Sequence, residues 1–386
     1  MAQTMSLLLI LLSLSLTVSN GAHNVIDFGA KPDGVSDNKK AFLDAWAKVC
    51  SSTQPASIYV PPGRFLVSQA DFMGPCKQNS VEIYIDGTIV APSGYTSTTK
   101  WILFQYVDGF SIFGGTLDGQ GHSMWNCKTS GSNCLEASTS LTIAQSKDVK
   151  IQGLTSVNSE GFHMSIYQSS GVTVQNIQIS APSNSPNTDG IHVQLSDHVI
   201  IQGSNIKTGD DCISLGAGSR NVLITDIYCG PGHGISIGSL GSIAHEQGVQ
   251  NVTVSSVVFH DTTNGVRIKT WGKHYQGYVQ FIMFQNIVMY NVSNPIIIDQ
   301  RYCPHNNNCP NQNSGVKISN VIYSNIRGYS DTEVAMKFDC SPSNPCQGIS
   351  LQDIKLTYQN QQAKSFCNNA SGFNSGTITP PSCLGS

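Results

Sequence analysis

Four ionisable residues lie at or next to one position of a repeated pattern in the middle of the chain. Asp189, Asp211 and His233 each directly precede a short apolar segment, and successive members lie 22 residues apart. Asp210 adds a further carboxyl group beside Asp211. If the segments are strands on consecutive coils of one repeating structure, these groups stack at about 4.8 Å per step. We therefore expect three carboxyl groups and an imidazole within about 10 Å of one another.

Carboxyl groups this close cannot all ionise, because like charges raise the pKa of at least one of them. One protonated acid beside ionised neighbours suits the hydrolysis of a glycosidic bond. The acid protonates the leaving oxygen and a carboxylate activates water. A single Asp before a strand is usually a turn residue that bonds its own backbone. Four groups in register on three segments favour a catalytic cluster instead.

Two cations follow on the next such segment. In Val266-Arg267-Ile268-Lys269 the side chains alternate, so Val266 and Ile268 face a core while Arg267 and Lys269 face outward. A solvated strand face is the ordinary explanation. Beside the acids, however, they can neutralise the cluster and bind a carboxylated sugar, and Arg offers a two-pronged match. Stacked Asp residues also suit calcium, but the neighbouring His233 and the two cations argue against it, and we expect no metal.

A second repeat sets the architecture. The pattern is Val-x-Ile-x-x-[Ile/Leu/Val], in which the alternation predicts a strand and the extra offset predicts a bend. Copies occur at Val149/Ile151/Leu154, Val172/Val174/Ile177, Val222/Ile224/Ile227, Val252/Val254/Val257, Ile282/Phe284/Ile287, Val316/Ile318/Val321 and Ile349/Leu351/Ile354, with variants at Val199/Ile201/Ser204 and Phe110/Ile112.

Short strands with no helical pattern between these units predict an all-β fold, a single-stranded right-handed parallel β-helix. A β-sandwich is the alternative, but hairpin signals are scarce, with only Asn264-Gly265 in its favour. The open end of a solenoid needs a cover. We expect a capping helix from Asp37 to Cys50 with Phe42 and Trp46 on its apolar face. The repeat is lost after Thr357. No linker divides residues 23–386, so one domain is expected.

Composition and cysteines limit the class of protein. The net charge is −3 and no basic stripe is present, which argues against a nucleic-acid partner. The sequence contains no C-x-x-C pair, which argues against a zinc ribbon. Twelve cysteines fall into near neighbours, which predicts six local disulfides in an oxidising compartment: Cys50/Cys76, Cys127/Cys134, Cys212/Cys229, Cys303/Cys309, Cys340/Cys346 and Cys367/Cys383.

The N-terminal residues 1–22 resemble a signal peptide. Leu7 to Leu16 form an apolar run too short to span a bilayer, followed by small residues where cleavage is plausible. The first five residues lack Lys and Arg, and a buried helix is the alternative. Sequons at Asn251, Asn291 and Asn369 agree with secretion. We therefore expect a secreted, extracellular protein with no membrane partner.

Four motifs carry a resemblance to a known family. Asn187-Thr188-Asp189-Gly190, Gly209-Asp210-Asp211-Cys212, Gly232-His233-Gly234 and Arg267-Ile268-Lys269 together resemble the signature motifs of the polygalacturonases, glycoside hydrolase family 28. Their order and spacing are specific to that family, and the resemblance covers nearly the whole mature chain. Within the family the chain is most similar to the plant, pollen-type exopolygalacturonases.

The resemblance implies an inverting hydrolase of α-1,4-linked polygalacturonic acid, acting in the plant cell wall. It assigns Asp210 as the general acid, Asp189 and Asp211 as the groups that activate water, and His233 as the residue that holds the acid's protonation state. It places Arg267 and Lys269 on the galacturonate carboxylate, with Asn187 and Tyr302 as further substrate contacts. No cofactor or metal is implied. The expected partner is pectin, and the protein is expected to be a monomer.

Several alternatives remain open at this stage. A pectate or pectin lyase would share the fold but cleave by elimination. A non-catalytic wall-binding protein could use the same scaffold, although the intact acid set argues against it. A rhamnogalacturonan hydrolase would not need the cations of Arg267 and Lys269. Exo and endo action differ in how loops close the groove, and the resemblance alone favours exo.

Overall fold

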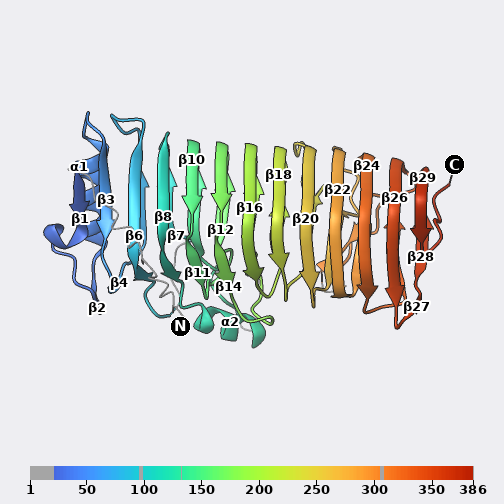
Figure 1. Ribbon diagram of the computed structural model, residues 1–386, viewed down its shortest axis with the longest axis horizontal. Coiled ribbons are helices and arrows are strands. Elements are labelled where there is room, and N and C mark those ends of the chain that lie inside the picture. Colours follow the sequence, from blue (N-terminus) through green and yellow to red (C-terminus); the bar gives the residue numbers. More distant parts are fainter. Residues whose placement is uncertain (1–20, 95–98, 132, 305–307, 386) are drawn as a thin grey trace, which may run out of the picture.

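The computed structural model describes residues 21–94, 99–131, 133–304 and 308–385. It is a right-handed parallel β-helix whose coils stack along the long axis of the molecule (Figure 1). This confirms the expected fold class. Residues 1–20, which hold most of the predicted signal peptide, lie outside the described part. Within the described residues, no helix is long and apolar enough to cross a membrane.

The larger sheet forms two sides of the coil. All its pairings are parallel except that of β26 with β27. Its 18 strands are β1 (Ala22–Asn24), β2 (Asp33–Asp37), β3 (Ala56–Val60), β4 (Arg64–Leu66), β6 (Val81–Val90), β8 (Phe110–Asp118), β10 (Lys147–Gln152), β11 (Thr155–Val157), β13 (Ser170–Gln175), β14 (Gln178–Ser180), β16 (Asp197–Lys207), β18 (Arg220–Cys229), β20 (Val249–His260), β22 (Gly277–Val292), β24 (Val316–Ser330), β26 (Cys346–Tyr358), β27 (Gln361–Gln362) and β29 (Ala370–Thr379).

The smaller sheet forms the remaining side, and every pairing in it is parallel. Its 11 strands are β5 (Ala70–Met73), β7 (Lys100–Gln105), β9 (Thr139–Ala144), β12 (Met164–Tyr167), β15 (Ile191–Gln194), β17 (Ile213–Leu215), β19 (Ile235–Leu240), β21 (Asn264–Trp271), β23 (Asn294–Tyr302), β25 (Val334–Asp339) and β28 (Lys364–Asn368). Neighbouring strands of this sheet carry the candidate site.

The predicted apolar repeat forms the core of the larger sheet. Its members pair across coils, so that Val222 pairs with Val252, and Val252 with Ile282. One copy was placed wrongly from sequence: Ile282 pairs with Val321, so the copy in β24 is Val321/Tyr323/Ile326. Tyr323 hides the pattern because its hydroxyl group breaks the apolar pattern at the second position, where another copy has Phe284. Its ring is buried and stacks on Phe284 at a centroid distance of 5.2 Å.

The expected bend lies between the second and third members of each copy. There one residue takes a left-handed conformation, which turns the strand and is tolerated best by Gly, Asn and Asp. The residues with positive φ at this corner are Gly153, Asn176, Gly203, Asp226, Ser256, Asn286, Asn325 and Asp353. The extra offset of the sequence pattern is therefore this single residue.

The expected N-terminal helix is present but begins two residues late, as α1 (Lys39–Cys50). Asn38 does not cap it through its side chain, which bonds the backbone of Lys31 and Leu66 instead. Phe42 and Trp46 are buried as predicted, and α1 lies at the N-terminal end of the coils (Figure 1). That α1 shields the first coil stays a prediction, which these contacts support.

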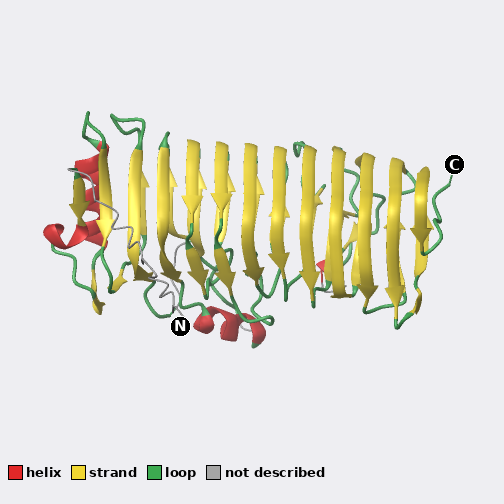
Figure 2. Cartoon of the chain, in the orientation of Figure 1, coloured by secondary structure: helices red, strands yellow, loops and turns green. Residues whose placement is uncertain are grey.

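Two further differences from the sequence interpretation concern the ends of the repeat. A second helix, α2 (His122–Thr129), interrupts the chain between β8 and β9, where no helix was expected. Figure 2 shows α1 and α2 at the margins of the array of strands. The coil also continues past Thr357, since β28 pairs with β25 and β29 with β26. This last coil faces solvent on one side, so its sequence lacks the apolar pattern. A short 3-10 helix, η1 (Val25–Phe28), follows β1.

The six predicted disulfides are all present. The described cysteines pair as expected and none is free. Five of the bridges span between 6 and 26 residues around turns or ends of coils. The bridge Cys212–Cys229 ties the residue after Asp211 to the end of β18.

Tyr323 offers a test of the core with a definite sign. Its hydroxyl group is buried and bonds no described residue, and burial raises the pKa of the phenol. Removing an unsatisfied buried hydroxyl removes its desolvation cost, so Tyr323→Phe should raise the free energy of unfolding by about 1 kcal/mol. Tyr323→Ala, which leaves a cavity, should lower it by about 3–5 kcal/mol. Denaturant unfolding followed by circular dichroism measures both. A Phe variant less stable than the wild type would contradict this account of Tyr323.

Candidate active site

The register of the smaller sheet brings the four predicted groups together. Ile191 pairs with Ile213, and Ile213 with Ile235, on consecutive strands β15, β17 and β19. Asp189, Asp211 and His233 each lie two residues before these positions. The three residues therefore occupy the same turn on three consecutive coils, as the spacing of 22 residues predicted.

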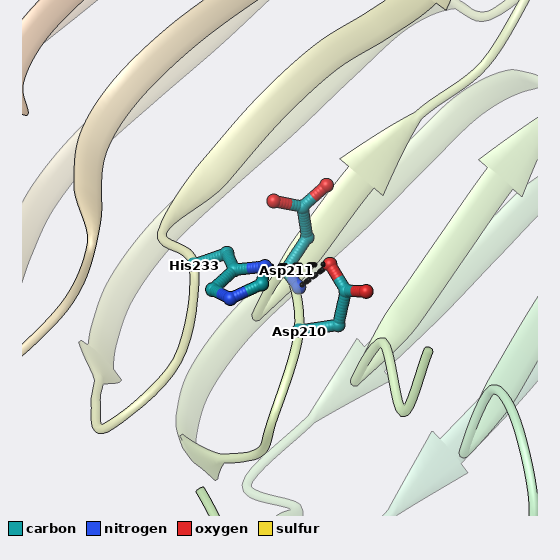
Figure 3. A group of neighbouring side chains, drawn as sticks. All are labelled: Asp210, Asp211 and His233. Atoms are coloured by element: carbon teal, nitrogen blue, oxygen red, sulfur yellow. Dashed lines mark hydrogen bonds and ion pairs between the residues drawn. The ribbon is translucent and has the colours of Figure 1, made fainter. Parts of the chain in front are cut away.

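Asp210 and His233 form one pair of the site. His233 Nδ1 lies 3.0 Å from Asp210 Oδ1, and the His233 amide donates to the Asp210 carbonyl at 2.7 Å. Figure 3 shows the imidazole and the Asp210 carboxyl group facing each other, with the Asp211 carboxyl group directed away. The turn needs Gly234, which has a φ of +87°, because a Cβ there would lie 2.1 Å from the Asn264 carbonyl oxygen. The imidazole is thus placed by the backbone as well as by its hydrogen bond.

Asp211 and Lys269 form a buried ion pair. Lys269 Nζ lies 2.7 Å from Asp211 Oδ2, with relative exposures of 10% and 2% for the two side chains. Ser236 Oγ donates to the other oxygen, Asp211 Oδ1, at 2.8 Å. Lys269 was predicted both to neutralise the acids and to bind a substrate carboxylate. The structure places it on a carboxylate of the protein, two strands away from its own.

Asp189 is the carboxyl group of the cluster that lacks a nearby cation among the described residues. It is buried, with Ser214 Oγ donating to its Oδ2 at 2.7 Å and no cation of the described residues within 4 Å. Burial, followed by the charges of Asp210 and Asp211, raises the pKa of Asp189 well above its usual range. Asp189 is therefore a carboxyl group on which the site disfavours ionisation.

The pKa of Asp210, unlike that of Asp189, is lowered, and the pKa of its partner His233 is raised. Burial alone would raise the pKa of Asp210, but the His233 hydrogen bond and charge outweigh it and leave the pKa below 3.8. The same hydrogen bond to Asp210 raises the pKa of His233 above 6.5, against the effect of burial. The pair therefore holds one shared proton over the pH range between these two values.

Arg267 and Tyr302 line the site beyond Lys269. Arg267 Nη2 lies 3.4 Å from Asp299 Oδ2, while its Nε is buried and bonds no described residue. The ring of Tyr302 lies against both cations, with its centroid 5.0 Å from Arg267 Cζ and 5.3 Å from Lys269 Nζ. Such contacts hold cations in place at a ring face. The structure thus brings Tyr302 to the predicted substrate-binding cations.

Asn187 lies on the opposite side of the acids. Its Nδ2 donates to Asp210 Oδ2 at 3.4 Å, and its Oδ1 accepts from Lys128 Nζ at 3.3 Å. All eight residues predicted for the site thus gather in one region, and the chain brings Lys128 of α2 there as well. Lys128 had no sequence signal, because its position depends on an irregular segment between two coils.

Sequence reasoning also missed a row of small polar residues under the acids. Ser214 and Ser236 pair in register with each other and with His192 and Arg267. His192 Nδ1 lies 2.7 Å from Ser214 Oγ, and burial lowers the pKa of His192 to about 4, so its ring is neutral. The sequence did contain a signal for these residues. His192, Ser214 and Ser236 occupy, on successive strands, the outward-facing position that Arg267 occupies in β21.

Three residues of this cluster also carry the types of side-chain atom that bind metal ions. Potential ligand atoms of Asp210, Asp211 and His233 lie within 4.8 Å of one another. However, Asp211 already accepts from Lys269 and Ser236, and His233 Nδ1 faces Asp210. A cation would have to displace an ammonium group 2.7 Å from one of its ligands. The donor set therefore fits acid–base chemistry better than a resident divalent ion.

Comparison with known proteins agrees with this geometry. The chain is 50% identical over 385 residues to a polygalacturonase of Prunus persica, covering 99% of this chain and 98% of that one. It is 40% identical over 370 residues to an exopolygalacturonase of Platanus acerifolia, with 94% and 97% covered. Among solved structures, the endo-xylogalacturonan hydrolase from Aspergillus tubingensis matches with a TM-score of 0.78 and 24% identity, covering 90% of this chain and 98% of that one. That likeness shows the fold alone.

The matched family spans nearly all of the β-helix. Residues 50–380 match the family described as Glycosyl hydrolases family 28, and this range includes every strand that carries the candidate site. Together with the relatives above, this match shows that the chain belongs to glycosyl hydrolase family 28.

Proposed function

We propose that the chain is a polygalacturonase, which hydrolyses the α-1,4 linkages of polygalacturonic acid with inversion. The observation that carries the proposal is the gathering of Asp189, Asp210, Asp211 and His233 in equivalent turns of three consecutive coils. Inverting hydrolysis needs a proton donor and a water-activating carboxylate in one site. The relatives named polygalacturonase support the choice of substrate.

The pairings assign a role to each group. Asp210 shares one proton with His233, so the pair can deliver that proton to the leaving oxygen as the glycosidic bond breaks. Asp211, in its ion pair with Lys269, is the carboxylate that takes a proton from the attacking water. Asp189, whose pKa is raised by burial, lies one coil away from Asp211 and orients that water. This differs from the family-based expectation only in naming Asp211 as the principal base.

The acidic sugar is bound by the cations beyond the acids. Arg267 keeps a buried Nε free of any described partner, and Tyr302 holds its guanidinium group against the sheet. A galacturonate carboxylate can accept from the accessible part of this guanidinium group, whose side chain is 16% exposed. Neutral sugars carry no charge for it to bind, which favours polygalacturonate over a rhamnogalacturonan.

The proposal extends to exo action, secretion and a role in the cell wall. The exopolygalacturonase relative of Platanus acerifolia supports release of sugars from a chain end. Six disulfides fit an oxidising compartment, as does the predicted signal peptide at residues 1–22. The sequon residues Asn251 and Asn291 are exposed at corners of the coil, where glycans could project.

Product analysis tests both the reaction and its mode. The protein should release new reducing ends from polygalacturonate, with galacturonic acid as the sole early product when digests are separated by anion-exchange chromatography. Asp210→Asn serves as the control and should lose at least about a thousandfold in kcat while remaining folded. A ladder of oligomers would replace exo by endo action. Products absorbing in the ultraviolet would identify a lyase, and binding without new reducing ends a non-catalytic protein.

The shared proton predicts the pH dependence. Above the raised pKa of His233 the pair holds no proton, so the alkaline limb of kcat/KM should lie above pH 6.5. In His233→Gln the proton must stay on Asp210 alone, a carboxyl group whose pKa lies far lower. The alkaline limb should then move toward acid by about one pH unit or more. An unchanged limb in His233→Gln, in a variant with normal thermal stability, would exclude the shared proton.

A further inference from the structure

Helix α2 places a lysine beside the acids from outside the repeating coils. Figure 1 shows α2 along the lower edge of the β-helix, beneath β11 and β14, on the N-terminal side of the catalytic coils. Its position is fixed: Trp125 is buried and its Nε1 donates to the Ser159 carbonyl at 3.0 Å, and Cys127 is bonded to Cys134. Lys128, in the last turn of α2, is therefore held where it is by the fold of the segment.

Lys128 is half-buried without a close ion partner. No carboxylate of the described residues lies within 4 Å of its Nζ, which donates to Asn187 Oδ1 at 3.3 Å. Burial lowers the pKa of Lys128, while the more distant charges of Asp210, Glu160 and Asp189 act against that shift. Lys269, in contrast, has Asp211 at 2.7 Å. Burying an ammonium group partly, without an anion beside it, costs free energy. An anionic ligand that pairs with the group removes that cost.

The two lysines lie on opposite sides of the acids along the axis of the β-helix. Asn187, which Lys128 contacts, belongs to the turn before β15, whereas Lys269 lies in β21. Asp210, Asp211 and His233 belong to the turns before β17 and β19, which lie between these two strands in the sheet. A polyanion laid along the axis therefore meets a cation on each side of the carboxylates that would otherwise repel it.

We propose that Lys128 is a substrate-binding residue. It binds the carboxylate of the sugar unit that lies toward the N-terminal end of the β-helix from the cleaved bond, and Arg267 binds the carboxylate of the sugar unit on the other side of that bond. This inference rests on the proposed function, because it needs a substrate with a carboxylate on each sugar. It makes α2 part of the substrate groove. The reaction then involves two carboxylate contacts, one on each side of the acids.

Removal of the Lys128 charge should mainly affect binding. Charge-assisted hydrogen bonds of this kind correspond to about tenfold or more in affinity. Lys128→Met should therefore raise KM for trigalacturonate about tenfold and change kcat less than about threefold. Lys128→Arg should recover most of the affinity. Lys48→Met, at an exposed position on the distant helix α1, is the matched control and should leave both constants unchanged.

A purely structural role would give a different result. If Lys128 only orients Asn187 toward Asp210, Lys128→Met should lower kcat with an unchanged KM, which would overturn the proposal. Calorimetric binding of trigalacturonate to Asp210→Asn, with and without Lys128→Met, measures affinity without turnover. Equal affinities would also overturn it. Wild-type protein that releases no reducing ends would refute the proposed function instead, and calorimetry on that protein would still decide whether Lys128 binds the acidic sugar.

Discussion

The ion pair of Lys269 with Asp211 is the interaction on which the site depends. Three carboxyl groups share a poorly hydrated region, where each added negative charge makes ionisation of the next less favourable. Lys269 pairs with Asp211 at 2.7 Å and His233 pairs with Asp210 at 3.0 Å, whereas the pKa of Asp189, the third group, is raised by burial. The cluster therefore holds protons and charges in fixed places before any substrate arrives. Preorganisation of this kind reduces the reorganisation that the reaction itself would require.

The β-helix makes this arrangement possible because it repeats one turn at a spacing of about 4.8 Å. Side chains from Asp189, Asp211 and His233 come close together although 44 residues separate the first from the last. The apolar columns beneath them, exemplified by Val222, Val252 and Ile282, fix the register that keeps the turns aligned. A slip of one residue would expose the core and misplace the acids together. Stability and catalysis thus share a single geometric requirement.

The sequence predicted the features that repeat and missed those that do not. The fold class, the bend and the gathering of the acids follow from periodic positions, and the six disulfides follow from cysteines that are near neighbours in the sequence. Tyr323 misled the alignment of one copy because it carries a hydroxyl group, although its ring is buried in the core like that of Phe284. The sequence predicted that Lys269 could neutralise the acids, but it did not identify Asp211 as the partner, because the long side chain crosses to a strand two positions away. Lys128 was missed because α2 lies in an irregular segment whose path only tertiary packing decides.

The stereochemistry of the first product tests the central claim most directly. If the proton shared by Asp210 and His233 serves the leaving oxygen while Asp211 activates water, one displacement occurs and the configuration at the cleaved carbon inverts. Proton NMR of a fresh digest of α-1,4-linked polygalacturonate should show the β-anomer of the new reducing end first, followed by mutarotation to the mixture. Initial appearance of the α-anomer would require a covalent intermediate and would contradict the account.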